Sequence, residues 1–171
     1  MTADGEPRAD DGGPGTVTIR TGTVADVDEV LRVWAGAGAH PTTTDDAASV
    51  TALVGRDPDA LLLAETGGRL VGTLIATWDG WRGNMYRLAV LPEVRRRGIA
   101  TALVSEGERR LQALGCRRVT ALVVDSDAHA ASFWTEVDYE RYPMKRYVHT
   151  LAVHTLGVHT LAVHTLGGGP W

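Results

Sequence analysis

Three arginines and a glycine, Arg95-Arg96-Arg97-Gly98, stand where a short apolar strand turns into a helix. The strand covers residues 85–90, Pro92 marks the turn, and helical spacing of apolar residues begins at Ile99. The first backbone N–H groups of a helix have no partner within it, and the helix dipole adds partial positive charge there. Arginine adds fork-shaped donors that suit phosphate oxygens, and glycine removes the Cβ where backbone approaches a ligand. This stretch predicts a phosphate-binding turn.

Two common phosphate-binding loops are excluded by the same residues. A Walker A loop needs a lysine after its last glycine, and the residue after Gly98 is Ile99. The G-x-G-x-x-G fingerprint of dinucleotide-binding folds is also missing from this stretch.

The segment LAVLPEVRRRGIATAL, residues 88–103, resembles the cofactor motif of the GNAT superfamily of acyl-CoA-dependent N-acetyltransferases. The family signature is Gln/Arg-x-x-Gly-x-Gly/Ala after a hydrophobic strand and a proline turn, and Arg95, Gly98 and Ala100 meet it. The resemblance implies that acetyl-CoA binds here as a co-substrate, without a metal. It also implies that a strand N–H near Val90 donates to the reaction oxyanion. The cofactor contacts that it implies are Leu88, Ala89, Val90, Arg95, Arg96, Arg97, Gly98, Ile99, Ala100 and Thr101.

A second segment, DSDAHAASFWTEVDYE, resembles the family pattern Asn-x-x-Ala-x-x-Phe-Tyr-x-x-x-Gly-Phe. It adds Asp127, Phe133 and Trp134 as cofactor contacts. Trp134 replaces a tyrosine that is credited with protonating the departing thiolate, and an indole N–H has no accessible acidity. Trp134 is therefore expected to pack in the core or against the pantetheine arm. Asp127 either bonds a pantetheine amide or caps the helix, and Asp138, at the family's glycine, tolerates a left-handed backbone.

Acetyl transfer needs a neutral amine that attacks the thioester carbonyl through a tetrahedral oxyanion. Because thiolate is a good leaving group, positioning and backbone N–H donation can carry much of the catalysis. The candidate acids and bases are Tyr86, Asp79 and Tyr139. Leu122 stands where acetyltransferases of ribosomal-protein N-termini carry a glutamate, which counts against that class of substrate.

Two stretches are candidates for binding the acceptor. The resemblance implies that the polar loop between the first two helices forms one wall of the acceptor cleft, with His40, Thr42 and Thr44. The alternative is that Thr44 or Asp45 caps the second helix and that His40 is a solvated loop residue. In the loop after the third strand, Trp78 and Trp81 either line the acceptor pocket or cover the sheet edge.

Periodicity and turn residues predict the order of the elements. Strands are expected at residues 16–21, 60–65, 70–78, 85–90 and 119–124, followed by last strands at 139–141 and 144–151. Helices are expected at residues 23–36, 45–54 and 98–115 and after Asp127, with Arg109 and Arg110 on a solvated helix face. Together with the resemblance, this order predicts a single α/β domain of the α+β, GNAT-like type. Its sheet is mixed and largely antiparallel, with helices on both faces.

Composition limits the other function classes. The chain has 171 residues, a formal net charge of −4 and a pI near 5.8. This acidic balance disfavours general nucleic-acid binding. The arginine run leaves an RNA-facing module as a weaker alternative. No stretch approaches the length of a membrane span. The single cysteine, Cys116, excludes an internal disulfide. The expected location is the cytoplasm.

The domain is expected to cover residues 16–150, with the Gly/Pro/Asp-rich residues 1–15 as a disordered lead-in. Residues 151–171 repeat a VHTL-type pentad. Five-residue spacing does not gather the repeated histidines on one face of a strand or a helix, so no metal site is expected there. The apolar, β-branched repeat suits either a functionless extension or pairing with a second subunit in a homodimer.

The sequence thus predicts an N-acetyltransferase that moves an acetyl group from acetyl-CoA to a primary amine of a small molecule or peptide. The alternative is a non-catalytic acyl-CoA sensor, suggested by Trp134 and by the lack of an obvious acid–base pair.

Overall fold

Five strands form one mixed sheet in the order β1-β2-β3-β4-β5. The computed structural model describes residues 16–151, so the lead-in and nearly all of the pentad repeat lie outside the described residues. The first four strands pair as antiparallel neighbours, and β5 runs parallel to β4. Their bounds are β1 Val17–Thr21, β2 Leu61–Thr66, β3 Arg69–Trp78, β4 Gly83–Val90 and β5 Val119–Ala121.

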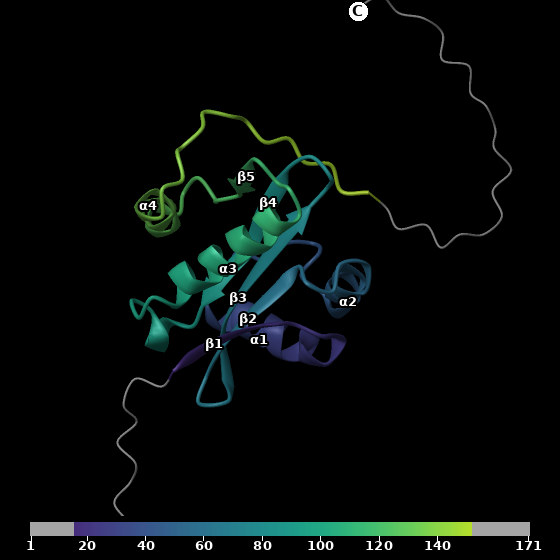
Figure 1. Cartoon of the computed structure of the whole chain (residues 1–171), viewed down its shortest axis with the longest axis vertical. Coiled ribbons are helices and arrows are strands. Elements are labelled where there is room, and N and C mark those ends of the chain that lie inside the picture. The colour runs from purple at the N-terminus through teal and green to yellow at the C-terminus, as the bar shows by residue number, and fades with distance from the viewer. Residues whose placement is uncertain (1–15, 152–171) are drawn as a thin grey trace, which may run out of the picture.

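Helices cover both faces of this sheet, as the sequence predicts (Figure 1). The helices are α1 Val27–Gly36, α2 Ala47–Arg56, α3 Ile99–Ala113 and α4 Ala128–Glu136. Neighbouring residues of a strand point to opposite faces. On β3, Gly72 lies against Ile99 and Leu103 of α3, whereas Thr73 bonds Trp34 of α1. Helix α1 therefore lies on one face of the sheet and α3 on the other. No helix within residues 16–151 is long and apolar enough to cross a membrane.

Helix α3 sits close to the sheet because glycine faces it. A Cβ on Gly72 would lie 3.1 Å from the carbonyl oxygen of Ala89 and 3.3 Å from side-chain atoms of Ile99 and Leu103. Ile99 and Leu103 are themselves buried. The start of α3 is thereby held against β3 and the end of β4, where the predicted phosphate turn stands.

An irregularity in β4 bends the middle of the sheet. The register between β3 and β4 shifts between Thr73 and Ile75, and Arg87 takes a left-handed backbone conformation with φ +52°. Thr73 is fully buried at this point. Its hydroxyl accepts a hydrogen bond from the indole N–H of Trp34 at 2.8 Å and donates one to the carbonyl oxygen of Arg87 at 3.0 Å. One side chain thus joins α1, β3 and the bulge of β4.

Strands β4 and β5 pair only over a short length. The ladder runs from Gly83 opposite Val119 to Met85 opposite Ala121, and a last bond of 3.4 Å joins the N–H of Leu122 to the carbonyl of Met85. The sequence predicts a buried strand over residues 119–124, but residues 122–124 leave the ladder and are exposed. The two strands therefore diverge toward their carboxyl ends.

Two further predictions are wrong. Residues 139–151 form no strand. Strand β5 has only three residues and so offers little edge for a further strand to pair with, and Pro143 lacks the N–H that a ladder needs. Arg110 is not on a solvated face: its guanidinium donates to the carbonyl of Ala76 at 2.7 Å and pairs with Asp57. Arg109 is exposed, as predicted.

Thr73→Val should destabilise the domain by about 2 kcal/mol or more, because the indole N–H of Trp34 and the carbonyl of Arg87 both lose a buried partner. The free energy of unfolding in urea checks this. Thr18→Val, on the exposed side of β1, is the matched control and should change stability by less than about 0.5 kcal/mol. Equal effects of the two substitutions would contradict a linking role for Thr73.

Candidate functional site

The turn between β4 and α3 has the geometry of an anion site. Gly98 is the N-cap of α3 with φ +78°, Arg96 also has a left-handed backbone with φ +59°, and no side chain caps this helix end. A Cβ placed on Gly98 would meet no atom within 4 Å, so the turn opens to solvent. The first N–H groups of α3 have no acceptor within the helix. They are available to a phosphate.

The three predicted phosphate arginines lie in different environments. Arg95 donates from Nε to the carbonyl of Val90 at 2.9 Å and from Nη2 to the carbonyl of Ala37 at 2.7 Å. Its guanidinium therefore ties the turn to the ends of β4 and α1. Arg96 and Arg97 are exposed and form no ion pair with any carboxylate of residues 16–151. Their charge remains for an anion at the turn.

The end of β4 presents a backbone N–H toward the gap between β4 and β5. Successive N–H groups of a strand point to opposite edges. The N–H of Leu91 bonds the carbonyl of Val71 in β3 at 2.9 Å, so the N–H of Val90 points the other way. On that side β5 pairs only as far as Met85. The predicted oxyanion donor thus faces the space left by the diverging strands.

Apolar surface lines the opposite side of this gap. Leu122, Val123 and Val124 follow β5 and are all exposed, between 36% and 47%. These three neighbouring side chains leave apolar surface open to solvent just beyond the end of β5. On β4, Leu88 is partly buried and Ala89 and Val90 are buried. An extended ligand with apolar and amide segments fits between such walls.

Helix α4 follows residues 122–124 in the chain and places Trp134 in the core, with Phe133 partly buried beside it. Trp134 is 8% exposed and packs edge-to-face with Phe133 at 5.5 Å and with Tyr139 at 4.7 Å between ring centroids. Core packing of Trp134 is therefore confirmed. Asp127 caps α4 by accepting from the N–H of Ala130 at 2.9 Å, and Asp138 has the expected left-handed backbone with φ +66°.

Arg87 organises the loop between α1 and α2, and the sequence patterns did not predict this role. Arg87 donates to the carbonyl of His40 and to the hydroxyl of Thr42, both at 3.0 Å, pairs with Asp45, and lies 5.2 Å from the ring of Trp34. Both partners of the ion pair are only 16% exposed. The only signal in the sequence is an arginine inside an otherwise apolar strand.

The loop residues that were candidates for acceptor binding also bond one another. Asp45 accepts from the N–H of Thr42 at 2.8 Å, and the hydroxyls of Thr42 and Thr44 are 3.3 Å apart. Neither Thr44 nor Asp45 caps the second helix. Asp46 does so by accepting from the N–H of Ser49 at 2.8 Å, so the helix begins at Ala47 rather than at residue 45. The loop is thus a fixed wall beside the bulge.

Of the three candidate acid–base residues, Tyr139 lies apart from Tyr86, on the other face of the sheet. Tyr86 pairs with Ile75 and so lies on the α1 face, on which the loop of residues 40–46 also lies. Burial and then the charge of nearby Asp79 raise the pKa of Tyr86. Tyr139 lies on the α3 face, where its hydroxyl is 3.5 Å from the sulfur of Met85, and burial and nearby Glu108 raise its pKa. Asp79 is exposed and accepts from the N–H groups of Arg82 and Trp81, which lower its pKa and make it a weak base.

Trp78 and Trp81 lie at the far end of β3 from the phosphate turn. Trp81 is 72% exposed, and the guanidinium of Arg82 lies 3.9 Å from its ring centroid. Within residues 16–151, no hydrogen bond or ion pair joins these two tryptophans to the loop held by Arg87. No group of three or more His, Cys, Asp or Glu side chains that could hold a metal occurs in this described part either.

The sequence pattern of the Acetyltransferase (GNAT) family matches residues 27–139 of this chain. The chain belongs to the GNAT family. An acetyltransferase of Photorhabdus laumondii is 37% identical over 123 residues, which are 71% of this chain and 85% of that protein. An acetyltransferase of Sodalis glossinidius is 34% identical over 115 residues, 67% of this chain and 81% of its own length. This GNAT protein is accordingly an acetyl-CoA-dependent acyltransferase.

Solved structures confirm the GNAT fold at lower sequence identity. The PaiA N-acetyltransferase of Thermoplasma acidophilum in complex with coenzyme A has a TM-score of 0.65 at 15% identity, covering 76% of this chain and 93% of that one. The aminoglycoside acetyltransferase AAC(6')-Iy, in complex with a bisubstrate analogue of CoA and acetylneamine, has a TM-score of 0.64 at 17% identity. The match covers 80% of this chain and 99% of that one.

Arg87→Gln should loosen the loop between α1 and α2 of this GNAT protein, because a largely buried guanidinium with three polar partners and an aromatic neighbour is lost. We expect a stability loss of about 1–3 kcal/mol and faster amide exchange in residues 40–46. Hydrogen exchange and urea unfolding check this. Arg69→Gln, which breaks an exposed ion pair with Glu93, should cost less than about 1 kcal/mol. Unchanged exchange in the loop would show that Arg87 does not hold it.

Proposed function

We propose that this GNAT protein transfers the acetyl group of acetyl-CoA to a primary amine of a small molecule or peptide, by direct attack in a ternary complex. The observation that supports this best is the divergence of β4 and β5 beside the open start of α3. A gap with one apolar wall, ending at a basic helix N-terminus, suits an extended thiol ester that carries a pyrophosphate.

The cofactor would lie along this gap. Its pyrophosphate binds the N–H groups at Gly98, Ile99 and Ala100 and the guanidinium groups of Arg96 and Arg97. Ile99 contributes through its backbone, because its side chain is buried against Gly72. The pantetheine passes between residues 88–90 of β4 and residues 122–124. The thioester then reaches the bulge, where the backbone irregularity ends the regular ladder.

The chemistry follows from what this geometry offers. The amine nitrogen forms a bond to the thioester carbon and the carbonyl oxygen becomes an oxyanion, which the N–H of Val90 stabilises. The C–S bond then breaks, the amine nitrogen gives up its proton and the thiolate becomes protonated. The acceptor arrives on the α1 face, between Tyr86 and the loop of His40, Thr42 and Thr44. Because Arg87 neutralises Asp45, this wall presents hydroxyl and carbonyl groups rather than net negative charge.

Tyr86 is the candidate for proton donation to the thiolate. It stands one residue before the bulge and on the acceptor side of the sheet. Burial raises its pKa above the ordinary value near 10, so the phenol stays protonated throughout the neutral range and is lost as a donor only at more alkaline pH. The alternative sensor reading rested on Trp134 in place of a tyrosine, and a phenol on β4 offers another source of the proton.

Calorimetric titration with acetyl-CoA, followed by thiol-release assays over polyamines, aminoglycosides and peptides, tests the proposal. We expect a micromolar dissociation constant for acetyl-CoA and thiol release with at least one class of amine, because these are ordinary values for such enzymes. The absence of acetyl-CoA binding would reject the site. Binding without release on any amine would support the sensor instead.

Gly98→Asp should abolish acetyl-CoA binding, because it sets a carboxylate against the pyrophosphate. Calorimetry checks this. Gly68→Asp in the β2–β3 turn is the matched control, because Gly68 has φ +73° and equally open surroundings, so both substitutions carry the same backbone strain. Affinity in the control should stay within about twofold. Equal affinity in the two variants would mean that the phosphate turn lies elsewhere.

Tyr86→Phe should lower kcat at neutral pH by about 100-fold, the usual contribution of a positioned acid, and leave the affinity for acetyl-CoA unchanged. Steady-state kinetics over a range of pH check this. Tyr139→Phe should keep kcat within about threefold, because its hydroxyl lies on the other face of the sheet. A larger loss in Tyr139→Phe than in Tyr86→Phe would reverse the assignment.

A further inference from the structure

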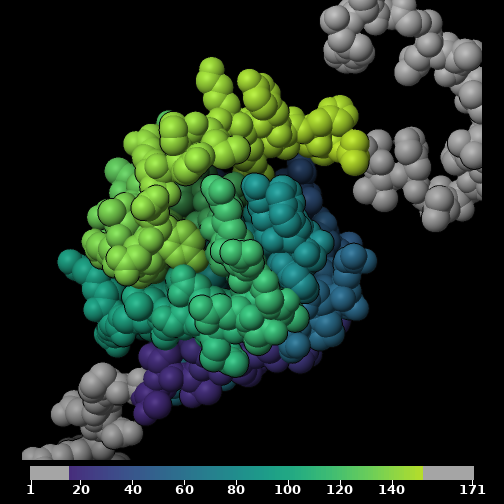
Figure 2. Space-filling model, turned by 45° about the horizontal axis from the view of Figure 1, so that its top comes forward, coloured from purple at the N-terminus to yellow at the C-terminus, as the bar shows by residue number. Residues whose placement is uncertain are grey.

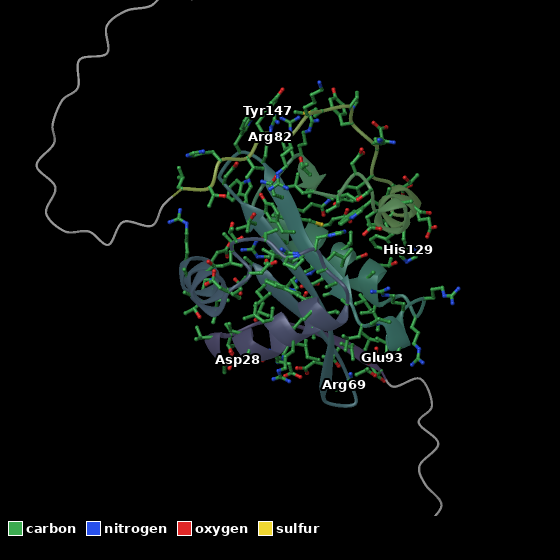
Figure 3. The ribbon with its side chains drawn as sticks, turned by 180° about the vertical axis from the view of Figure 1, so that it is seen from behind. Asp28, Arg69, Arg82, Glu93, His129 and Tyr147 are labelled. Atoms are coloured by element: carbon green, nitrogen blue, oxygen red, sulfur yellow. The ribbon has the colours of Figure 1, made fainter. Side chains whose placement is uncertain are left out.

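A pocket lies at the end of the sheet opposite the phosphate turn. It has a volume of about 480 Å³ and is lined by Trp78, Trp81 and Arg82 from the end of the β3–β4 hairpin and by Arg117 and Arg118 from the connection between α3 and β5. Figure 3 shows Arg82 at the opposite end of the molecule from Glu93, which belongs to the turn before α3. From Gly83 to Val90 the strand rises by roughly 23 Å, so this pocket is separate from the acetyl-CoA site.

The two loops that form the pocket are held together by backbone bonds. The N–H of Gly83 donates to the carbonyl of Arg118 at 2.9 Å, and Gly83 pairs with Val119 in the β4–β5 ladder. Cys116 also donates to the carbonyl of Arg118, at 3.2 Å. Asp79 fixes the hairpin end by accepting from the N–H groups of Trp81 and Arg82 at 2.8 and 2.7 Å. The pocket is therefore built on hydrogen-bonded backbone, although Trp81, Arg117 and Arg118 of its lining are exposed.

Positive charge at this pocket exceeds what its surroundings neutralise. None of the guanidinium groups of Arg82, Arg117 and Arg118 forms an ion pair with a carboxylate in the described part of the chain, whereas Arg20, Arg69, Arg87, Arg109, Arg110 and Arg141 all do. The nearby carboxylate is that of Asp79, which leaves a surplus of positive charge. Such a surplus is notable in a chain whose formal net charge is −4. A charge-bearing ligand of opposite sign would complete it.

Aromatic rings accompany the arginines. Arg82 stacks on Trp81 at 3.9 Å, and Arg118 lies 5.2 Å from the ring of Tyr142, which belongs to the stretch after α4. Figure 2 shows that this stretch runs along one edge of the molecule, and Figure 3 places Tyr147 of the same stretch beside Arg82. Trp81 is largely exposed, so part of its ring is accessible to a ligand. Guanidinium groups over aromatic faces are a common arrangement for stacking planar rings.

We propose that this pocket binds a small organic anion, a planar ring that carries a carboxylate or phosphate, separately from acetyl-CoA. The ring stacks on Trp81 and Arg82, and the anionic group accepts from Arg117 and Arg118. The volume is that of a small-molecule site rather than of a nucleic-acid or protein interface. The proposal does not depend on acetyl transfer, because occupancy is measured by binding alone.

The test is a calorimetric titration of the full chain, saturated beforehand with coenzyme A so that the phosphate turn is occupied. Phenyl phosphate and benzoate are the probes, and they distinguish a phosphate ligand from a carboxylate ligand. Benzyl alcohol supplies the ring without the charge, and inorganic phosphate supplies the charge without the ring. We expect one-site binding of at least one anionic probe with a dissociation constant of about 1 mM or tighter. Benzyl alcohol and inorganic phosphate should bind at least about tenfold more weakly.

Substitutions locate the site. Arg118→Ala and Trp81→Ala should each weaken the probe about tenfold or more. Arg109→Ala, which removes one exposed arginine outside the pocket, should leave the affinity unchanged. No saturable binding, equal losses in Arg109→Ala and Arg118→Ala, or a probe that coenzyme A displaces would each overturn the proposal. Unchanged coenzyme A affinity in all three variants shows that the cofactor site is intact and keeps the two proposals separable.

Discussion

One extra residue in β4 sets the geometry on which the site depends. The bulge at Arg87 shifts the register against β3, and β4 parts from β5 after Met85. A regular ladder would have paired the N–H of Val90 and filled the gap with a neighbouring strand. The hydroxyl of buried Thr73 fixes the bulge, because it donates to the carbonyl of Arg87 and accepts from the indole N–H of Trp34. The bulge, which lies just beyond the last β4–β5 pair, is therefore fixed by core packing.

The arginines show how one residue type is divided between structure and ligand binding. Arg95, Arg87 and Arg110 each place their guanidinium on backbone carbonyls of another element, and each ties two or more segments together. Arg96 and Arg97 at the phosphate turn, and Arg82, Arg117 and Arg118 at the opposite end, face outward without ionic partners in residues 16–151. Several arginines are thus part of the scaffold, and two groups of arginines without ionic partners in residues 16–151 lie at opposite ends of the sheet.

Sequence reasoning was strongest where the determining interactions are local. The hairpin was recognisable from two glycines between apolar runs, and β2 and β3 lie within one or two residues of the prediction. It failed for the last strands, because a strand also needs an edge to pair with. β5 is too short to supply one beyond Ala121. It failed for Arg110 as well, because a helix position that looks solvated from spacing alone faces Asp57 and the carbonyl of Ala76.

The sequence by itself determined the family, the order of the main elements up to α4 and the open turn before α3, because proline, glycine and the start of a helix act through neighbouring residues. Only the tertiary structure decided which arginines form ion pairs within residues 16–151 and on which face of the sheet each tyrosine lies. Tyr86 and Tyr139 are equivalent as residue types, yet the register of β4 puts one on the α1 face while α4 carries the other to the α3 face. Likewise, Arg87 contacts His40, Thr42 and Asp45, which lie 47, 45 and 42 positions away in the sequence. Contacts over such distances depend on the packing of the whole sheet, which no local pattern encodes.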